Sequence, residues 1–126
     1  MPSRSARPRF LNLFQIRQPI TALVSIIHRI SGVLLFLSLP FAVGLLHLSL
    51  RSAGDYQRVL HWLALPGMKL LGLLLGWAIL HHFFAGLRFL LLDLDLGLRL
   101  QTARATAWSV FAIVAVFFLL LAWRLA

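Results

Sequence analysis

Cysteine is absent from this 126-residue chain, and acidic residues nearly are. Without cysteine the chain cannot form disulfides, hold an iron–sulfur cluster, bind haem through a thiolate or attach haem through a cysteine pair. The three acids are Asp55, Asp93 and Asp95. Because the last two fall at a predicted membrane edge, catalysis by paired carboxylates is not expected.

Apolar and basic residues dominate what is present. The sequence is 61% hydrophobic with a mean hydropathy of +0.93, which is too apolar for a soluble domain of this size. A net charge of +9 is compatible with nucleic-acid binding. However, the arginines lie at the ends of apolar runs and are not interleaved with aromatic residues on one patch. That pattern is typical of topology determinants in a membrane protein, so we expect no nucleic-acid partner.

Three long apolar runs predict an all-α integral membrane protein with three transmembrane helices in a single domain, residues 1–126. The spans are expected at about 22–50, 67–92 and 106–124, after a basic tail at 1–19. Between them we expect a loop or short amphipathic surface turn at 51–66 and a second loop at 95–105. With eight of the twelve basic residues on the side of the amino terminus, the positive-inside rule places that terminus in the cytoplasm.

The second span contains two adjacent histidines, His81 and His82, deep in an otherwise apolar run. Ionisable groups at membrane depth are costly and suggest function, and a neutral imidazole there is a good axial ligand for haem iron. Gly86 lies one turn after His82 on the same helix face, where it would leave room for a flat macrocycle. The alternative is a histidine that hydrogen-bonds a neighbouring helix.

A haem held by two histidines needs both ligands at a similar depth. Counting from Asp93 at about 1.5 Å per residue, His82 lies roughly 15 Å into the membrane and His47 roughly 25 Å. His28 is expected near the inner edge, and the third span has no histidine. We therefore expect any second ligand to come from another chain.

A second group of polar residues lies at the inner end of the first span. Ser25 and Arg29 are four residues apart on one helix face, with His28 adjacent and Gly32 on about the same face. A hydroxyl, a guanidinium and an imidazole in this position could hydrogen-bond a quinone carbonyl or hold an anionic group such as a haem propionate. The alternative is an arginine that extends to the interface among ordinary neighbours.

With these two motifs in place, the chain resembles the cytochrome b membrane-anchor subunit of succinate dehydrogenase (succinate:quinone oxidoreductase). Residues 18–33, QPITALVSIIHRISGV, are similar to that family's serine–x–x–histidine–arginine–x–serine–glycine motif. Residues 81–93, HHFFAGLRFLLLD, are similar to its histidine–x–x–x–glycine–hydrophobic–arginine segment ending in aspartate. The resemblance extends over nearly the whole chain. It departs at Phe89, where many members have histidine.

The resemblance implies a role for each matching residue. His82, which three residues separate from the motif glycine Gly86, is the candidate axial ligand of haem b in preference to His81. Ser25 and Arg29 match the quinone-site serine and arginine, and His28 matches a histidine near the haem propionates. Arg88 and Asp93 are expected to contribute only orientation and packing.

The resemblance also implies a setting. This chain and a second small membrane subunit would share haem b, anchor a flavoprotein subunit and an iron–sulfur subunit to a bacterial inner membrane, and form the ubiquinone site. Succinate oxidation itself would belong to the flavoprotein. The alternatives are the anchor of a quinol:fumarate reductase and a structural anchor without haem. A small transporter is disfavoured because it would need a buried charged pair.

Overall fold

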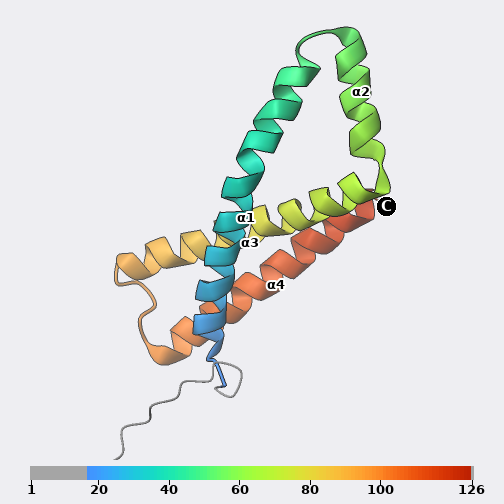
Figure 1. Ribbon diagram of the computed structural model, residues 1–126. Helices are drawn as coiled ribbons and strands as arrows, with labels where there is room; N and C mark the ends of the chain where they lie inside the picture. The colour runs from blue at the N-terminus through green and yellow to red at the C-terminus, as the bar shows by residue number, and fades with distance from the viewer. Residues whose placement is uncertain (1–16, 126) are drawn as a thin grey trace, which may run out of the picture.

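The computed structural model describes residues 17–125, so residues 1–16 of the predicted basic tail lie outside the described residues. Within that range the chain is all-helical, with four helices in the order α1 (Ile20–Ser49), α2 (Ala53–Ala64), α3 (Pro66–Asp93) and α4 (Leu100–Leu125) (Figure 1). Of these, α1, α3 and α4 are long and apolar enough to cross a membrane. This confirms the predicted fold class of three membrane-length helices.

Two helix boundaries differ from the sequence-based expectation. The third long helix begins at Leu100, six residues before the predicted start, and the chain at 51–66 is mostly the short helix α2 where a loop or turn was expected. Both segments are polar enough to lie outside the apolar core of a membrane. Hydropathy detects the part of a helix that crosses lipid and not the turns that extend beyond it, which explains both differences.

The helix α2 begins with a side-chain cap. Ser52 Oγ accepts a hydrogen bond of 3.1 Å from the backbone N–H of Asp55, and the Asp55 carboxylate lies 3.2 Å from the Arg58 guanidinium. An acid in the first turn also interacts favourably with the positive end of the helix dipole. Local polar contacts thus specify a helix in a segment that hydropathy alone leaves undefined.

The helix α3 ends in a Schellman motif that directs the chain into α4. The N–H of Asp95 donates to the Leu92 carbonyl at 3.0 Å, and the N–H of Leu96 donates to the Leu91 carbonyl at 3.0 Å. Asp95 takes the left-handed conformation that this motif requires, with φ of 60°. Asp95 is therefore a helix-terminating residue, a role that its charge did not indicate.

The long helices meet in one crossing. In Figure 1, α1 passes across α3, while α4 lies alongside α3. The packed interior is small and consists of small or β-branched residues: Val24 on α1, Ala85 on α3, and Ala107, Val110 and Val114 on α4. Small residues permit the close helix approach on which association in lipid depends. On α3, Gly76 serves this purpose, because a Cβ there would overlap Leu121 of α4.

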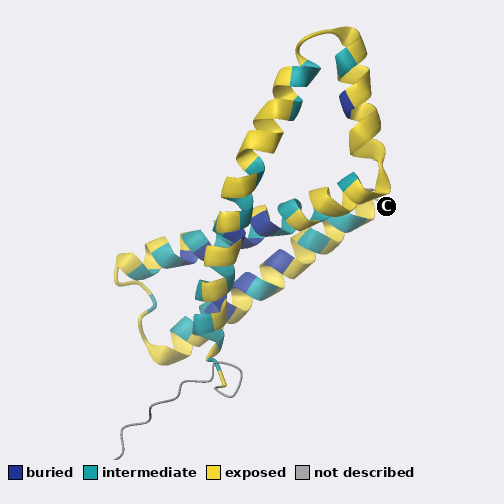
Figure 2. Ribbon diagram, viewed as in Figure 1, coloured by how far each residue is buried: buried dark blue, intermediate teal, exposed yellow. Residues whose placement is uncertain are grey.

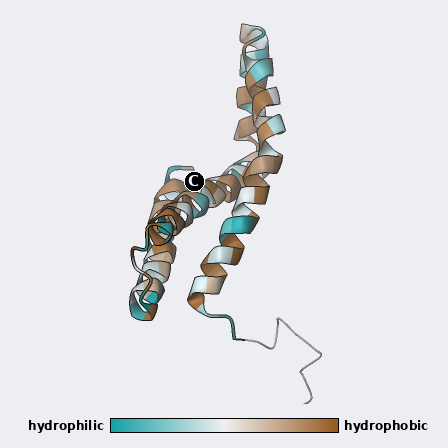
Figure 3. Ribbon diagram, turned by 90° about the vertical axis from the view of Figure 1, so that its left-hand side faces the viewer, coloured by the Kyte–Doolittle hydropathy of each residue, from teal (hydrophilic) through white to brown (hydrophobic). Residues whose placement is uncertain are grey.

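Most of the remaining apolar surface is exposed. Figure 2 shows buried residues mainly where α1, α3 and α4 pack together, with Val59 of α2 also buried, and Figure 3 shows hydrophobic residues over most of the long helices. Phe36, Phe41 and Trp123 are each more than 70% exposed. Such a surface requires a lipid environment or partner helices, so the chain is a multi-pass membrane protein.

Candidate functional site

At the crossing of α1 and α3, each helix places a glycine beneath the other helix's histidine. A Cβ on Gly32 of α1 would lie 2.9 Å from Cε1 of His82, and a Cβ on Gly86 of α3 would lie 3.4 Å from Nε2 of His28. The two imidazole rings stack face to face, with centroids 4.2 Å apart and planes 7° from parallel. The glycines thus let the two histidines fill the crossing.

The expectation that His28 and His82 lie at different depths is wrong. It rested on depths counted along separate helices, and α1 begins at Ile20. His28 is consequently about 12 Å inside its helix, at 1.5 Å per residue. By the same measure His82 is about 16 Å from Asp93, and the crossing of the two helices then brings the rings together.

Hydrogen bonds define the protonation of His82. Its Nδ1 lies 3.1 Å from the carbonyl oxygen of His28, which can only accept, so Nδ1 carries the proton and donates. The hydroxyl of Ser31 donates to the same carbonyl at 2.8 Å and presents its oxygen to Nδ1 at 3.3 Å. In this tautomer Nε2 retains its lone pair, which is the state required of a metal-ligating nitrogen.

The pairing with His28 is not itself an iron site. Two axial ligands would hold iron between nitrogens that point at it, whereas these rings lie face to face. The face of Gly86, where the sequence suggested room for a macrocycle, is covered by the His28 ring. His28 therefore supports and orients His82 in this arrangement, and the expectation of an external second ligand still stands as a prediction.

Ser31 is the residue of this site that sequence reasoning missed. It is fully buried and its hydroxyl joins the backbone of α1 to the ring of His82. Its position three residues after His28, inside an apolar run, was the available signal. Phe89, at the position of the family's histidine, contacts the His28 ring edge-on with centroids 5.2 Å apart, so the contact here is apolar.

His81 lies on a different side of α3. Its ring is fully buried between Trp77, with centroids 5.8 Å apart, and Phe111 of α4, with centroids 5.6 Å apart. Neither ring nitrogen makes a hydrogen bond of standard geometry within the described chain, and the backbone of Val24 on α1 is the polar group that interacts with the ring. The two adjacent histidines thus have separate environments: His82 faces the glycine of α1, and His81 is enclosed by aromatic rings.

Ser25 and Arg29 lie one turn apart on α1, but they do not join the histidine stack. Arg29 is exposed and Ser25 half-buried, and no hydrogen bond or ion pair links either side chain to the residues that the structure describes. An exposed guanidinium on a membrane-spanning helix is costly unless lipid headgroups, a ligand or another subunit solvate it. His47 and His61 are also exposed.

Known proteins are similar to this chain in sequence. The model of the family described as succinate dehydrogenase/fumarate reductase transmembrane subunit matches residues 3–121. The succinate dehydrogenase cytochrome b556 subunit of Coxiella burnetii (strain RSA 493 / Nine Mile phase I) is 38% identical over 109 residues, which are 85% of this chain and 86% of that protein. The protein of the same name from Rickettsia bellii (strain RML369-C) is 29% identical over 117 residues, or 93% of this chain and 90% of that one. With the family model covering almost the entire sequence, this chain belongs to the succinate dehydrogenase/fumarate reductase transmembrane subunits.

Proposed function

We propose that this chain is the cytochrome b anchor of a succinate dehydrogenase, that His82 binds haem b iron, and that Ser25 and Arg29 form part of a ubiquinone site. The observation that carries the haem assignment is the hydrogen bond from His82 Nδ1 to the His28 carbonyl. In a neutral imidazole a proton on Nδ1 leaves the lone pair on Nε2, and the bond holds the ring in a fixed orientation. The names of the two relatives, both cytochrome b556 subunits of succinate dehydrogenase, support the same assignment.

The residues present fit a haem with one ligand from this chain. His82 offers Nε2, Ser31 and His28 orient its ring, and Gly32 and Gly86 keep the backbone close. A bound haem b would accept and release single electrons beside the quinone. The second axial histidine would come from a second small membrane subunit, and His28 would lie near the haem propionates.

The quinone half of the proposal depends on the exposed face of α1. Arg29 has no ionic partner in the described chain, so its guanidinium is available to donate to a quinone oxygen on which negative charge develops. The hydroxyl of Ser25, one turn earlier, would hydrogen-bond a quinone carbonyl and help to deliver a proton. Because this face is open, partner subunits would complete the pocket and exclude water from it.

The remaining parts of the proposal concern the setting. A flavoprotein would oxidise succinate, an iron–sulfur subunit would carry the electrons, and this chain would anchor both at a bacterial inner membrane with its amino terminus in the cytoplasm. The family description includes both succinate dehydrogenases and fumarate reductases, whereas both relatives bear the name succinate dehydrogenase. Assays of succinate oxidation and fumarate reduction in isolated membranes, with the native quinone identified, would distinguish the two directions.

A reduced-minus-oxidised visible spectrum of the purified complex tests the haem assignment. We expect a b-type signal in the wild type that His82→Ala abolishes or greatly lowers. His81→Ala is the matched control, because it removes an adjacent imidazole that packs against Phe111 of α4 and is not part of the His28–His82 stack. The opposite ranking of the two variants would transfer the ligand to His81, and an intact complex without a b-type signal would leave a structural anchor.

A second assay tests the quinone assignment. Arg29→Ala should lower succinate:ubiquinone reductase activity while the reduction of an artificial acceptor by succinate continues. Arg51→Ala is a suitable control, because Arg51 is an exposed arginine at the opposite end of α1. Unchanged ubiquinone reduction in Arg29→Ala would contradict the role given to this arginine.

A further inference from the structure

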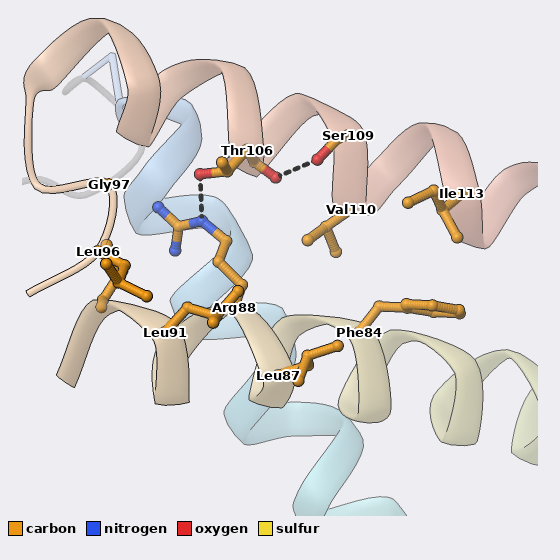
Figure 4. Close-up of a pocket in the computed structure, with 11 residues that line it drawn as sticks. Phe84, Leu87, Arg88, Leu91, Leu96, Gly97, Thr106, Ser109, Val110 and Ile113 are labelled. Carbon is orange, nitrogen blue, oxygen red and sulfur yellow. Dashed lines mark hydrogen bonds between the residues drawn. The ribbon is translucent and has the colours of Figure 1, made fainter. Parts of the chain in front are cut away.

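A cavity of about 390 Å³ lies between α3 and α4, away from the histidine stack (Figure 4). Its walls are largely apolar and include Phe84 and Leu87 on α3 and Val110 and Ile113 on α4. Leu87 is 47% exposed and Ile113 is 37% exposed, so the mouth of the cavity opens on the outer surface of the helix pair. In a membrane, that surface faces lipid unless another subunit covers it.

Arg88 brings a positive charge into this apolar space. It is only 6% exposed, its Nε donates to Thr106 Oγ1 at 3.1 Å, and its Nη2 donates to the Ala103 carbonyl at 3.1 Å. The guanidinium carbon also lies 5.5 Å from the centre of the Phe89 ring. All of these partners are neutral.

No carboxylate balances this charge in the part of the chain that the structure describes. The two ion pairs there both use Asp55, which lies beyond the other end of α3. A buried cation is costly unless an anion accompanies it. Two hydrogen bonds employ only part of the five N–H donors of a guanidinium, which leaves donors for such an anion.

The hydroxyl groups that line the cavity already donate hydrogen bonds to backbone carbonyls. Thr106 donates to the Ala103 carbonyl at 3.2 Å, and Ser109 donates to the Thr106 carbonyl at 2.8 Å (Figure 4). Among the residues described as lining the cavity, Arg88 is consequently the strong donor available to a ligand. Removing it should therefore remove most of the polar recognition.

Arg88 lies near the interfacial end of α3. It lies five residues before the end of the helix at Asp93, or about 7.5 Å along the axis. Arg99 and Arg104, both exposed, follow at the same end of the helix pair. In the other direction the cavity is lined by Phe84 and Ile113, deeper in the span. A charged group near the interface and an apolar channel beyond it follow the order of a phospholipid headgroup and acyl chain.

We propose that this cavity binds an anionic phospholipid, with Arg88 donating to a phosphate oxygen and part of one acyl chain lying against Phe84, Val110 and Ile113. A carboxylate from a partner subunit would neutralise Arg88 but would leave the apolar end of the cavity unfilled. An anionic phospholipid would supply both a phosphate for Arg88 and an acyl chain for the apolar end of the cavity. The residues that line this cavity include none of the proposed haem and quinone residues, and Phe89 is the side chain that contacts both Arg88 and His28.

Native mass spectrometry of the detergent-solubilised complex, purified through this chain, tests the proposal. Phosphatidylglycerol, phosphatidylcholine and diacylglycerol are titrated separately, and inorganic phosphate is added as a competitor. We expect phosphatidylglycerol to bind most tightly and to raise the midpoint of thermal unfolding, with phosphatidylcholine weaker, diacylglycerol weakest and inorganic phosphate without effect. Arg88→Gln should weaken phosphatidylglycerol binding about tenfold, as expected for the loss of a charged hydrogen bond.

Three further variants make the outcome specific. Ile113→Trp should weaken binding by filling the apolar end of the cavity while leaving Arg88 in place. This variant tests the site even if Arg88→Gln fails to fold. Arg88→Lys should retain part of the affinity, because it keeps the charge but loses the planar fork. Arg104→Gln, which removes an exposed cation of the same region, should bind phosphatidylglycerol as the wild type does.

Several results would overturn the proposal. Equal binding of phosphatidylglycerol to the wild type and Arg88→Gln would show that the guanidinium is not the determinant. Displacement of the lipid by inorganic phosphate would indicate a site for free anions. If the wild-type complex does not bind phosphatidylglycerol while Arg88→Gln releases a subunit, then a partner's carboxylate and not a lipid balances the charge.

Discussion

The close contact between Gly32 and His82 makes Gly32→Ala the most informative single substitution in this chain. A Cβ at this position would lie 2.9 Å from Cε1 and 3.3 Å from Nδ1 of His82. Ordinary carbon–carbon contacts are about 3.5–4.0 Å, so the ring or the helix must move by roughly 0.6–1.1 Å. The ring cannot move freely, because it stacks on His28 and donates to the backbone of α1.

The magnitude follows from two opposing terms. Overpacking of a well-filled site costs about 1–3 kcal/mol, while alanine in place of glycine in a helix contributes about 1 kcal/mol of stability. We expect Gly32→Ala to be between neutral and about 2 kcal/mol less stable, with a weaker b-type haem signal because the ring is displaced. Thermal unfolding and the reduced-minus-oxidised spectrum of the purified complex measure both effects.

Two other glycines provide matched controls. A Cβ on Gly86 would lie 3.4 Å from His28 Nε2, close to ordinary contact, and nothing lies within 4 Å of a Cβ on Gly44 of α1. Gly44→Ala should be neutral or stabilising with an unchanged spectrum, and Gly86→Ala should fall between the two. If Gly32→Ala and Gly44→Ala behave alike in both measurements, the packing argument for the histidine crossing is refuted.

Three further predictions concern the hydrogen bonds and caps. Ser31→Ala should cost about 1–2 kcal/mol in thermal unfolding and broaden or weaken the b-type signal, because the buried hydroxyl beside His82 is lost; an unaltered complex would remove Ser31 from the site. His81→Leu should raise the unfolding midpoint or leave it unchanged, because it replaces two buried nitrogens that have no hydrogen bond in the described chain with apolar atoms; a marked loss of stability would reveal a partner for that ring. Asp95→Gly should stabilise the chain by about 1 kcal/mol, since glycine adopts the left-handed conformation of the α3 cap without strain, and destabilisation would show that the aspartate side chain has another role.

The sequence by itself was sufficient to predict the features that depend on composition and on the length of apolar runs. Apolar runs of membrane length predicted the three long helices, because the bilayer requires that length and that composition wherever a helix crosses. The motifs around His28 and His82 indicated the family, which the comparisons confirmed. Local hydrogen bonds also specify the start of α2 and the cap at Asp95. Both features were missed, because polar segments produce no hydropathy signal.

Only the tertiary structure decided which side chains meet. Depth counted along single helices placed His28 and His82 apart, because such a count could not include the angle at which α1 crosses α3. The packed structure instead stacks the two rings, gives His82 its tautomer through Ser31 and the His28 carbonyl, and separates His82 from His81. It likewise buries Arg88 without a carboxylate between α3 and α4. Such contacts depend on the relative rotation and crossing of helices, which small residues on several helices determine together and which no single apolar run encodes.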